Sequence, residues 1–491
     1  MENLLPLFVA IPLGMAFLNL ILTKFIRKIS PYLTLVVVIV QLALAILFLG
    51  HAPFHYAVGG WQPPFGITLV WDALSQLLIF IIALISLAVT FFAIPYMQQY
   101  TAQSKFYALY LLMLAGMNGV ILTGDFFNLF VFLEIASIAS YALVAFGVEA
   151  EELEASFKYL VLGGVSSVII LLGIALLYAT TGSLNMAHVA TSLHNGVSLN
   201  LLFFIFSLFI MGFGLKSAMV PFHAWLPDAH PSAPAPISAM LSGLIIKVLG
   251  VYAILRIFFM VLGILPIIKT ILMVLGGLSM VVGVFLAVGQ WDFKRLLAYH
   301  SISQMGYVMV GIGLATPLGI LGGLFHLLNH AVFKSLLFLC SGAFEYATGT
   351  RQLKQLGGLI RKMPLTGSSC SVAALSISGV PPFNGFWSKL IIIVALIQAQ
   401  YYFLAAVTVF VSFMTLISFI KVQKYSLFGS LPERLKTIKE SPALMVAGML
   451  LLALACVALG VLYPFYGDAL LESARNLIIH SGQYAKYALP G

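Results

Sequence analysis

The stretch that decides the fold is residues 212–228, which read GFGLKSAMVPFHAWLPD. It lies in an apolar run, 199–229, that is longer than one membrane crossing needs, and it places Pro221 shortly after Lys216. Proline lacks a backbone N–H and clashes with the preceding helical turn, so this run is expected to be a broken helix. Unpaired backbone is not tolerated against lipid, and it is found where protein or a water-filled cavity surrounds it. The break therefore predicts a polar site inside a membrane protein.

A second stretch has the same character. In SGVPPFNGFWSK, residues 378–389, Pro381 and Pro382 come just before Lys389, inside the long apolar run 366–399. Two breaks in corresponding positions indicate an internal repeat of two five-helix units. An odd number of helices in a unit inverts the second unit relative to the first, which is typical of transporters with a site at each break.

The composition supports a membrane protein. Of the 491 residues 62% are hydrophobic and only 8% are charged, against roughly 25% charged in ordinary globular domains. This excludes a water-soluble fold. The net charge of +9 does not indicate nucleic-acid binding, because the basic residues lie in short loops between apolar runs.

About fourteen apolar runs are long enough to cross the bilayer, which takes about 20 residues in a helix. We therefore predict an all-α integral membrane fold in which the seventh and twelfth helices are broken. The runs are 4–22, 31–50, 68–95, 106–122, 126–147, 156–180, 199–229, 234–258, 264–289, 296–316, 317–346, 366–399, 402–423 and 442–465. They divide into N-terminal helices 1–3 in residues 1–100, a first repeat of helices 4–8 in 101–260, a second repeat of helices 9–13 in 261–425, and helix 14 with a tail in 426–491.

Basic residues predict the orientation. Lys and Arg collect in short cytoplasmic loops, and alternate loops, beginning with 23–30, hold 16 of the 24. Both termini are therefore expected outside, in a multi-pass protein of the cell (inner/cytoplasmic) membrane.

Glu134 is an acidic residue well inside a predicted helix, in FFNLFVFLEIASIASYALV, beside small residues such as Ser137 that allow close helix contact. An ionised group at the bilayer centre costs at least about 2.5–3.5 kcal/mol, so its default interpretation is functional. We expect Lys216 to be its partner, because a nearby carboxylate keeps a lysine protonated whereas burial without one drives the proton off. The pair would then act as a proton switch. A static ion pair that holds two helices together is the alternative.

Further ionisable groups continue from this pair. Lys247 lies near the middle of its predicted helix, and His326, His330 and Lys334 recur every four residues in FHLLNHAVFKSLLF, on one stripe of a helix. Histidine titrates near pH 6.5 and a buried lysine can be pulled toward neutrality, so such a stripe can relay protons. Lys389 follows the second break. It would complete a lateral row of ionisable groups across the protein, in the order Glu134, Lys216, Lys247, the stripe of His326, His330 and Lys334, and Lys389. Histidines satisfied by hydrogen bonds are the alternative; no metal is expected, because no HExxH motif and no acidic ligand accompany them in that helix.

Other polar residues favour structural roles. Asp228 and His230 are expected to fix the loop after the first break, with a role at a proton entrance as the alternative. Asp72, Asp125 and Glu345 lie near predicted helix ends, and Asp292, Lys294 and Arg295 form a predicted cytoplasmic loop that signals orientation. Cys340, Cys370 and Cys456 are far apart in the sequence and form no CxxC pair, so neither an iron–sulfur cluster nor a structural zinc nor a disulfide framework is expected.

Five blocks, in order, resemble the antiporter-like subunits shared by Mrp cation/proton antiporters (the D-type subunit), respiratory complex I and membrane-bound hydrogenases. The resemblance covers about residues 70–425, and its blocks are FNLFVFLEIASIASYALV, GLKSAMVPFHAWLPDAHPSAPAPISAMLSG, FKRLLAYHSISQMGY, HLLNHAVFKSLLFLCSG and SGVPPFNGFWSK.

The resemblance implies a proton-translocating subunit of fourteen helices with two inverted five-helix repeats. It implies proton translocation by Glu134, Lys216, Lys247, His326, His330, Lys334 and Lys389. One branch of the family has glutamate at the last position, so lysine here favours the Mrp D type and the related hydrogenase subunits. The chain ends shortly after the fourteenth helix, so no long lateral helix is expected.

The leading hypothesis is thus a proton-translocating subunit among sibling membrane subunits, in an Mrp-type Na⁺/H⁺ antiporter or a membrane-bound hydrogenase. A proton-pumping subunit of complex I is the alternative, and a non-transporting scaffold and a quinone-binding oxidoreductase remain lesser ones. No nucleotide fingerprint, haem motif or cluster ligands occur, so no cofactor is expected and any redox step belongs to another subunit. Sodium, if transported, is expected to pass elsewhere, because hard cations need several oxygen ligands.

Overall fold

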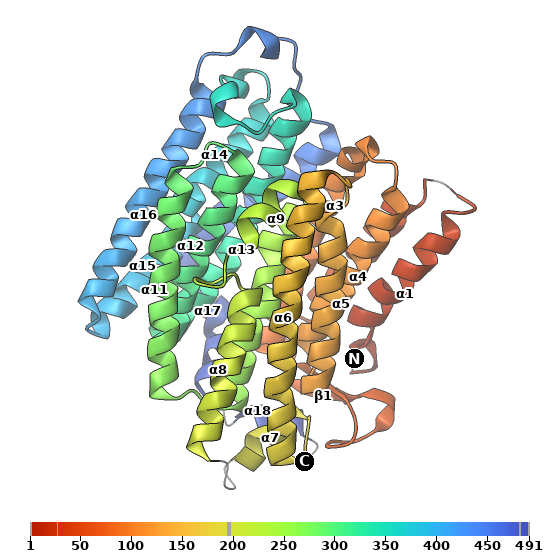
Figure 1. The fold of residues 1–491 in the computed structure, drawn as a ribbon, viewed down its shortest axis with the longest axis vertical. Coiled ribbons are helices and arrows are strands. Elements are labelled where there is room, and N and C mark those ends of the chain that lie inside the picture. The colour runs from red at the N-terminus through yellow and green to blue at the C-terminus, as the bar shows by residue number, and fades with distance from the viewer. Residues whose placement is uncertain (1, 27, 194–197, 481–482, 490–491) are drawn as a thin grey trace.

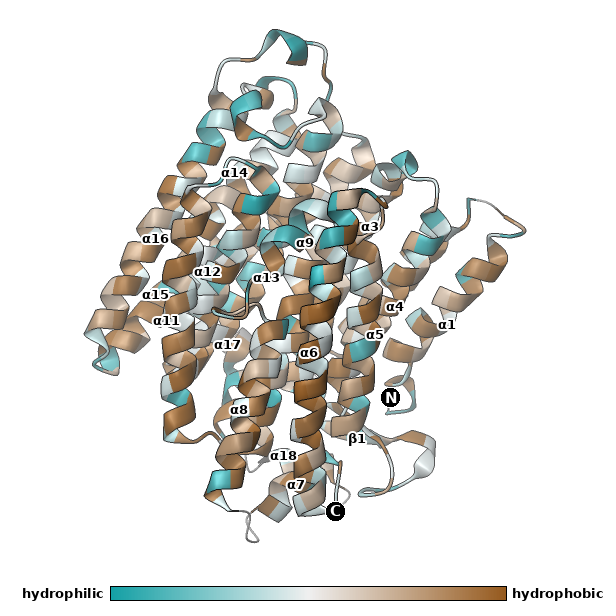
Figure 2. Cartoon of the chain, viewed as in Figure 1, coloured by the Kyte–Doolittle hydropathy of each residue, from teal (hydrophilic) through white to brown (hydrophobic). Residues whose placement is uncertain are grey.

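The computed structural model describes residues 2–26, 28–193, 198–480 and 483–489, and it is a bundle of long helices (Figure 1). Apolar residues dominate the length of the helices, while hydrophilic residues gather at the ends of the bundle (Figure 2). Among the described residues, 12 helices are long and apolar enough to cross a membrane. The chain is a multi-pass integral membrane protein.

The helices occur in the order that the sequence predicts. Three precede the repeats: α1 (Leu7–Leu22), α2 (Ser30–Phe48) and α3 (Ala73–Tyr96). The first unit consists of α4 (Gln103–Leu122), α5 (Phe126–Val144), α6 (Ala150–Thr181), α8 (Leu199–Lys216) with α9 (Leu226–Ser232), and α10 (Ala235–Met240) continued by the π-helical turns η5 (Leu241–Ile245), η6 (Lys247–Tyr252) and η7 (Leu255–Val261). The second unit consists of α11 (Pro266–Val288), α12 (Phe293–Gly313), α13 (Pro317–Thr348), α14 (Pro364–Ser378) with α15 (Asn384–Gln398), and α16 (Tyr402–Val422).

Shorter elements complete the described chain. After the second unit come η10 (Gln423–Phe428), η11 (Glu433–Leu435), the long α17 (Ala443–Ile479) and α18 (Gln483–Ala488). Elsewhere lie η1 (Glu2–Leu4), β1 (Phe54–Ala57), η2 (Val58–Gly60), β2 (Thr68–Trp71), η3 (Met97–Gln99), α7 (Met186–Ser192), η8 (Leu353–Gln355) and η9 (Leu359–Arg361).

Two predicted crossings lie outside the set of 12 strongly apolar helices. α12 is polar for a spanning helix because it contains residues such as His300, Ser303 and Gln304. α14 and α15 have 15 residues each, because the second break divides one crossing into two short helices. With these two included the described chain makes fourteen crossings, and the predicted fold is confirmed.

The two units repeat one local design. Asp125 caps α5 by accepting a hydrogen bond from Asn128 N, and it forms an isolated bridge with Asn185. Asp292 caps α12 in the same way and bridges Gln352. In each unit the next helix, α6 or α13, has 32 residues and ends at a left-handed glycine.

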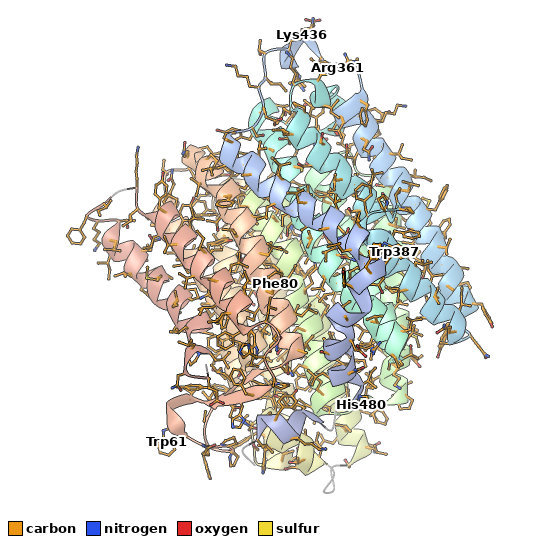
Figure 3. All side chains as sticks on the ribbon, turned by 180° about the vertical axis from the view of Figure 1, so that it is seen from behind. Trp61, Phe80, Arg361, Trp387, Lys436 and His480 are labelled. Atoms are coloured by element: carbon orange, nitrogen blue, oxygen red, sulfur yellow. The ribbon has the colours of Figure 1, made fainter. Side chains whose placement is uncertain are left out.

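The second unit is inverted. The segment after α6, which includes α7, lies at the lower end of the bundle in Figure 1. The segment after α13 includes Arg361, which Figure 3 places at the upper end. Equivalent connections therefore lie at opposite ends of the bundle, as the odd number of helices in each unit requires.

Close helix packing in the second unit depends on glycine. A Cβ added at Gly306 of α12 would collide with the backbone carbonyl of Gly276 in α11, and one at Gly311 would lie 2.9 Å from the backbone of Gly323 in α13. Small residues at such crossings let helices approach closely in a membrane, where dispersion rather than water exclusion holds them together.

Three predicted helix boundaries were wrong. Residues 68–71 form strand β2, paired antiparallel with β1, and α3 begins only after Asp72, whose side chain caps it together with Ser75. α6 begins at Ala150, six residues before the predicted start, because Glu149 and Glu152 cap its first turn. α17 crosses obliquely over the face of the bundle that Figure 3 shows, toward the lower end where His480 lies, and continues well beyond residue 465.

A buried ion pair fixes the lower end of the bundle. Arg256 in η7 binds both carboxylate oxygens of Asp72, and both side chains are at most 1% exposed. The Tyr487 hydroxyl donates to the same carboxylate at 3.1 Å. Burial alone would raise the pKa of Asp72, but the Arg256 charge and the hydrogen bonds from Ser75 and Tyr487 hold that pKa below its usual value.

We expect Asp72→Asn to lower the free energy of unfolding at pH 7 by about 3–5 kcal/mol, because it leaves Arg256 buried without a counter-charge. Asparagine can still cap α3, so the loss of stability reports the missing negative charge and not a missing helix cap. Since the folded-state pKa of Asp72 is depressed, the stabilisation is complete above about pH 4 and disappears as the pH falls further. The difference in unfolding temperature between purified Asp72→Asn and the purified wild type should therefore become smaller in acid.

Asp228→Asn is the matched control, because Asp228 pairs with Lys158 and Arg295 near the surface. It should cost less than about 1 kcal/mol. Equal unfolding temperatures for Asp72→Asn and the wild type at pH 7 would contradict the proposed role of the ion pair.

Candidate functional site

Glu134 and Lys216, predicted as partners, do meet. Glu134 lies on α5 and Lys216 is the last residue of α8, and Lys216 Nζ lies 3.8 Å from Glu134 Oε1. The lysine donates hydrogen bonds to Ser137 Oγ at 3.0 Å and to Tyr141 Oη at 3.3 Å, while Ser167 Oγ donates to the Glu134 carboxylate. At 3.8 Å the ion pair is long, and hydroxyl groups provide the closest contacts of both charges.

The first break holds Lys216 in place. α8 ends there, and Ala218 takes a left-handed conformation with φ 55°. The freed carbonyl of Leu215 accepts a hydrogen bond from the Trp225 indole at 3.0 Å, and Val220 N donates to Ser279 Oγ in α11 at 2.9 Å. These partners satisfy the backbone that Pro221 frees from the helix, as hydrocarbon surroundings require.

Lys247 lies in η6, inside the wide π-helical part of the last helix of the first unit, and it is 2% exposed. Its ammonium group donates to the backbone carbonyl of Ser242. No carboxylate of the described residues lies within ion-pair distance of it. Single π-helical turns are frequent at functional sites.

The stripe on α13 is completely buried. His326 Nδ1 lies 2.9 Å from Ser388 Oγ, and its ring is 6.3 Å from that of His330. Neither ring nitrogen of His330 has a hydrogen-bond partner among the described residues. Lys334 donates to the carbonyl of Leu297 in α12.

The second break positions Lys389. α14 ends at Ser378, Gly379 takes a left-handed conformation with φ 78°, and α15 begins at Asn384. Lys389 Nζ donates to the freed carbonyl of Ile377 at 2.7 Å and to Ser412 Oγ at 3.2 Å. A Cβ at Gly379 would lie 3.0 Å from the Lys389 side chain, so the glycine makes room for it.

Lys247 of the first unit forms one electrostatic cluster with the groups of the second unit. The charges of Lys247 and Lys389 both act on His326 and His330, and that of Lys334 acts on His330. The first-unit pair meets this cluster through helix packing. Gly250, one turn beyond Lys247, lies against Ser217, the neighbour of Lys216, so closely that any side chain there would collide.

Sequence reasoning missed the hydroxyl groups. Ser137 was expected to permit close packing, but it accepts the hydrogen bond from Lys216. Ser137 and Tyr141 lie three and seven residues after Glu134, on one face of α5, and that spacing could have found them. His300 in α12, at 2.8 Å from Ser418 Oγ, was also overlooked.

The weaker candidates have structural partners. Asp228 makes ion pairs with Lys158 at 3.0 Å and Arg295 at 3.4 Å. Lys294 was expected in a loop, but it lies in the first turn of α12, is 3% exposed and pairs with Glu345. Cys340, Cys370 and Cys456 are free and buried.

Known proteins share this architecture. Residues 123–415 match the model of a family described as NADH:quinone oxidoreductase/Mrp antiporter, transmembrane. The D-type subunit of the Na⁺/H⁺ antiporter of Alkalihalophilus pseudofirmus is 35% identical, over 91% of this chain and 90% of the relative. The N-type subunit of the NADH-quinone oxidoreductase of Desulforudis audaxviator is 36% identical, over 85% of this chain and 87% of the relative.

Two solved structures have the same fold. A chain of the Mrp complex from Dietzia sp. DQ12-45-1b superposes with a TM-score of 0.91 at 30% identity, covering 100% of this chain and 99% of that one. A chain of the membrane-bound sulfane sulfur reductase, an archaeal respiratory membrane complex, gives 0.91 at 32% identity, covering 99% of both. With this fold, this row of charges and these relatives, the chain belongs to the NADH:quinone oxidoreductase/Mrp antiporter transmembrane family.

Proposed function

We propose that this chain is the proton-translocating, antiporter-like membrane subunit of a multi-subunit complex, either the D-type subunit of an Mrp-type Na⁺/H⁺ antiporter or its counterpart in a membrane-bound hydrogenase. One observation carries the proposal. The Glu134–Lys216 pair lies at one helix break and Lys389 at the other, with Lys247 and the α13 stripe between them; every member except the partly exposed Glu134 is buried in the bundle. Buried ionisable groups in a membrane mark ion pathways by default.

The pair would act as a switch. With Glu134 close, Lys216 keeps its proton; when the two separate, the buried ammonium loses its counter-charge and the amine form is favoured. The long ion-pair distance and the hydroxyl groups of Ser137, Tyr141 and Ser167 let either charge retain hydrogen bonds while the pair opens.

The rest of the row would pass protons between the two breaks. His330 has two unpartnered ring nitrogens among the described residues, and buried polar atoms of this kind are where ordered water binds. A neutral imidazole takes up a proton on one nitrogen and releases one from the other, so His326 and His330 can connect Lys334 with Lys389.

A proton-pumping subunit of complex I is the second candidate, and the similarity to the N-type subunit of NADH-quinone oxidoreductase favours it. Lysine at position 389 favours the Mrp D type and the related hydrogenase subunits. The neighbouring genes discriminate the two, because small antiporter subunits, hydrogenase subunits or dehydrogenase subunits would each identify the complex. Sodium, if transported, would pass through another subunit.

The upper end of the bundle is proposed to be cytoplasmic, in the cell membrane, with both termini outside. The loops that carry Arg361 and Lys436 lie at the upper end, and His480 lies at the opposite one (Figure 3). This arrangement follows the positive-inside rule. We also propose residues 101–260 and 261–425 as the two repeat units, between helices 1–3 in 1–100 and helix 14 with its tail in 426–491.

A sibling membrane subunit is proposed to cover the face of α5 and α6. The Glu134 side chain is 26% exposed in this chain, beside the exposed apolar residues Ile138 and Val168. A carboxylate open to lipid would be costly, so a neighbouring protein surface fits this face better than hydrocarbon does.

We expect Glu134→Ala and Lys216→Ala each to lower proton transport at least tenfold, because each removes half of the switch. The measurement is proton uptake into vesicles that contain the whole complex, normalised to the amount of assembled complex. Lys158→Ala is the matched control: this lysine also pairs with acidic groups, but at an exposed position. Wild-type rates for Glu134→Ala across the pH range would refute the switch, and full transport by Lys216→Ala would favour a scaffold.

Gly379→Ala should lower transport severalfold without preventing assembly, because the new Cβ would press on the Lys389 side chain. Gly349→Ala is its matched control. Gly349 has a similar positive φ of 71° but open space around it, so both variants carry a backbone strain of about 1–2 kcal/mol and only the first contacts a row residue. Equal transport by the two variants would contradict the role given to Lys389.

A further inference from the structure

A second buried lysine–carboxylate pair lies apart from the row. Lys294 of α12 and Glu345 of α13 are 2.9 Å apart at the upper end of the second unit. The lysine is 3% exposed and the carboxylate 28%, so the pair lies at the boundary between the interior and the surface. The row described above uses neither residue.

On its outer side the pair adjoins a polar hollow. This hollow has a volume of about 380 Å³ and is lined by Glu149, Ala150, Glu151, Glu152, Ser232 and Arg351. Arg351 links the hollow to the pair, since its Nη1 lies 3.9 Å from Glu345 Oε1 and donates to the carbonyl of Pro231 at 2.8 Å. Arg351 therefore connects the polar hollow to the carboxylate side of the pair, and the Glu345 side chain is itself 28% exposed.

On its inner side the pair adjoins α9, which packs against α12 (Figure 1). Lys294 Nζ donates to the carbonyl of Ala233 at 3.3 Å. Ser238 Oγ donates to the carbonyl of His230 at 2.8 Å and to that of Ala233 at 3.3 Å. The Ala233 carbonyl that binds Lys294 is therefore linked through Ser238 to the backbone of His230.

His230 lies between this pair and the row. Its side chain is completely buried, and neither ring nitrogen has a hydrogen-bond partner among the described residues. Its ring stacks on Phe338 at 4.6 Å, and Lys334 Nζ lies 5.6 Å from the same phenyl ring. The charges of Lys294, Lys334 and Lys247 all act on it.

We propose that Lys294 and Glu345 form the gate of a proton entrance at the upper end of the chain, and that His230 relays protons from this gate to Lys334. The proposal rests on the proposed function. When the pair opens, the Glu345 carboxylate takes a proton from water in the hollow, and water inside passes it to one ring nitrogen of neutral His230. The other nitrogen releases its proton to the neutral amine of Lys334, so the Glu345 carboxylate and the neutral imidazole are both restored and the transferred proton resides on the Lys334 ammonium.

A purely structural ion pair explains less of this arrangement. Such a pair needs no polar hollow in front of it and no unpartnered histidine behind it. Buried polar groups are nearly always hydrogen-bonded, so two orphan nitrogens on one buried ring indicate a place for water. The three features lie in sequence from the surface to Lys334.

The first experiment measures proton flux in vesicles that contain the whole complex, per assembled complex. Glu345→Gln and His230→Phe should each lower the flux at least tenfold, and Glu345→Asp should retain most of it. Phenylalanine preserves the stacking on Phe338 while it removes both nitrogens. Asp228→Asn, in the same short helix as His230, is the control and should stay within twofold of the wild type.

The second experiment measures access directly. Ala233→Cys, behind the gate, should react slowly with a membrane-impermeant thiol reagent, and combining it with Lys294→Met should raise the labelling rate at least fivefold from the upper side only. The native chain, whose three cysteines are buried, gives the background. An unchanged labelling rate would overturn the gate.

Lys216→Ala in the same vesicles separates this inference from the proposed function. If Lys216→Ala loses flux while Glu345→Gln and His230→Phe keep the wild-type rate and pH dependence, the entrance is wrong and the function stands. If Lys216→Ala keeps the flux, the proposed function fails. Wild-type flux after the charge exchange Lys294→Glu with Glu345→Lys would show a static pair and overturn the gate.

Discussion

Every backbone polar group inside the hydrocarbon layer needs a partner, and the arrangement of this protein depends on how that need is met at the two helix breaks. At the first break the partners are the Trp225 indole and Ser279 Oγ; at the second, the carbonyl of Ile377 is bound by Lys389 itself. Ser279 belongs to the second unit although it satisfies the break of the first. The two units therefore interlock at the first break, while the second break is satisfied within its own unit.

The same constraint explains the surroundings of the lysines. Lys247, Lys334 and Lys389 donate to backbone carbonyls, and only Lys216 has a carboxylate beside it in the row. A carbonyl oxygen satisfies a donor but does not cancel its charge, so these ammonium groups are incompletely compensated. A buried charge of this kind is costly and tends to give up its proton instead. Sites that hold a proton weakly suit a row that passes protons along.

The global fold was predictable because its determinants are local in sequence. The lengths of the apolar runs predicted the membrane crossings, and Pro221 and Pro382 predicted the helix breaks. Glu134 was identified because it is a single acidic residue among apolar neighbours. The helix α12 was predicted as the apolar run 296–316, although it contains several polar residues. The repeat was visible in the matching positions of the two breaks.

The rest depended on contacts between distant segments. The strand at 68–71 forms because it pairs with Phe54–Ala57, and an apolar sequence that is read alone fits a helix equally well. The Lys294–Glu345 pair joins two helices whose facing sides the sequence does not specify. The spacing along α5 could have placed Ser137 and Tyr141 beside Glu134, but the hydroxyl group that binds Glu134 comes from Ser167 of α6, and only the packed structure brings it there.

The hydrogen bond from Tyr487 to Asp72 also imposes an order on the assembly of the lower end. Tyr487, which donates to Asp72, lies 415 residues after it, and the carbonyl of Tyr487 is 2.9 Å from His55 Nδ1 in β1. During synthesis, the β1–β2 hairpin, the start of α3 and η7 are therefore made long before α18. Their contacts with this helix form only when it has been synthesised. Asp72 and Arg256 can pair before that moment, but the Tyr487 hydrogen bond to Asp72 forms only after α17 has crossed the membrane, so a segment made late in synthesis binds one made early.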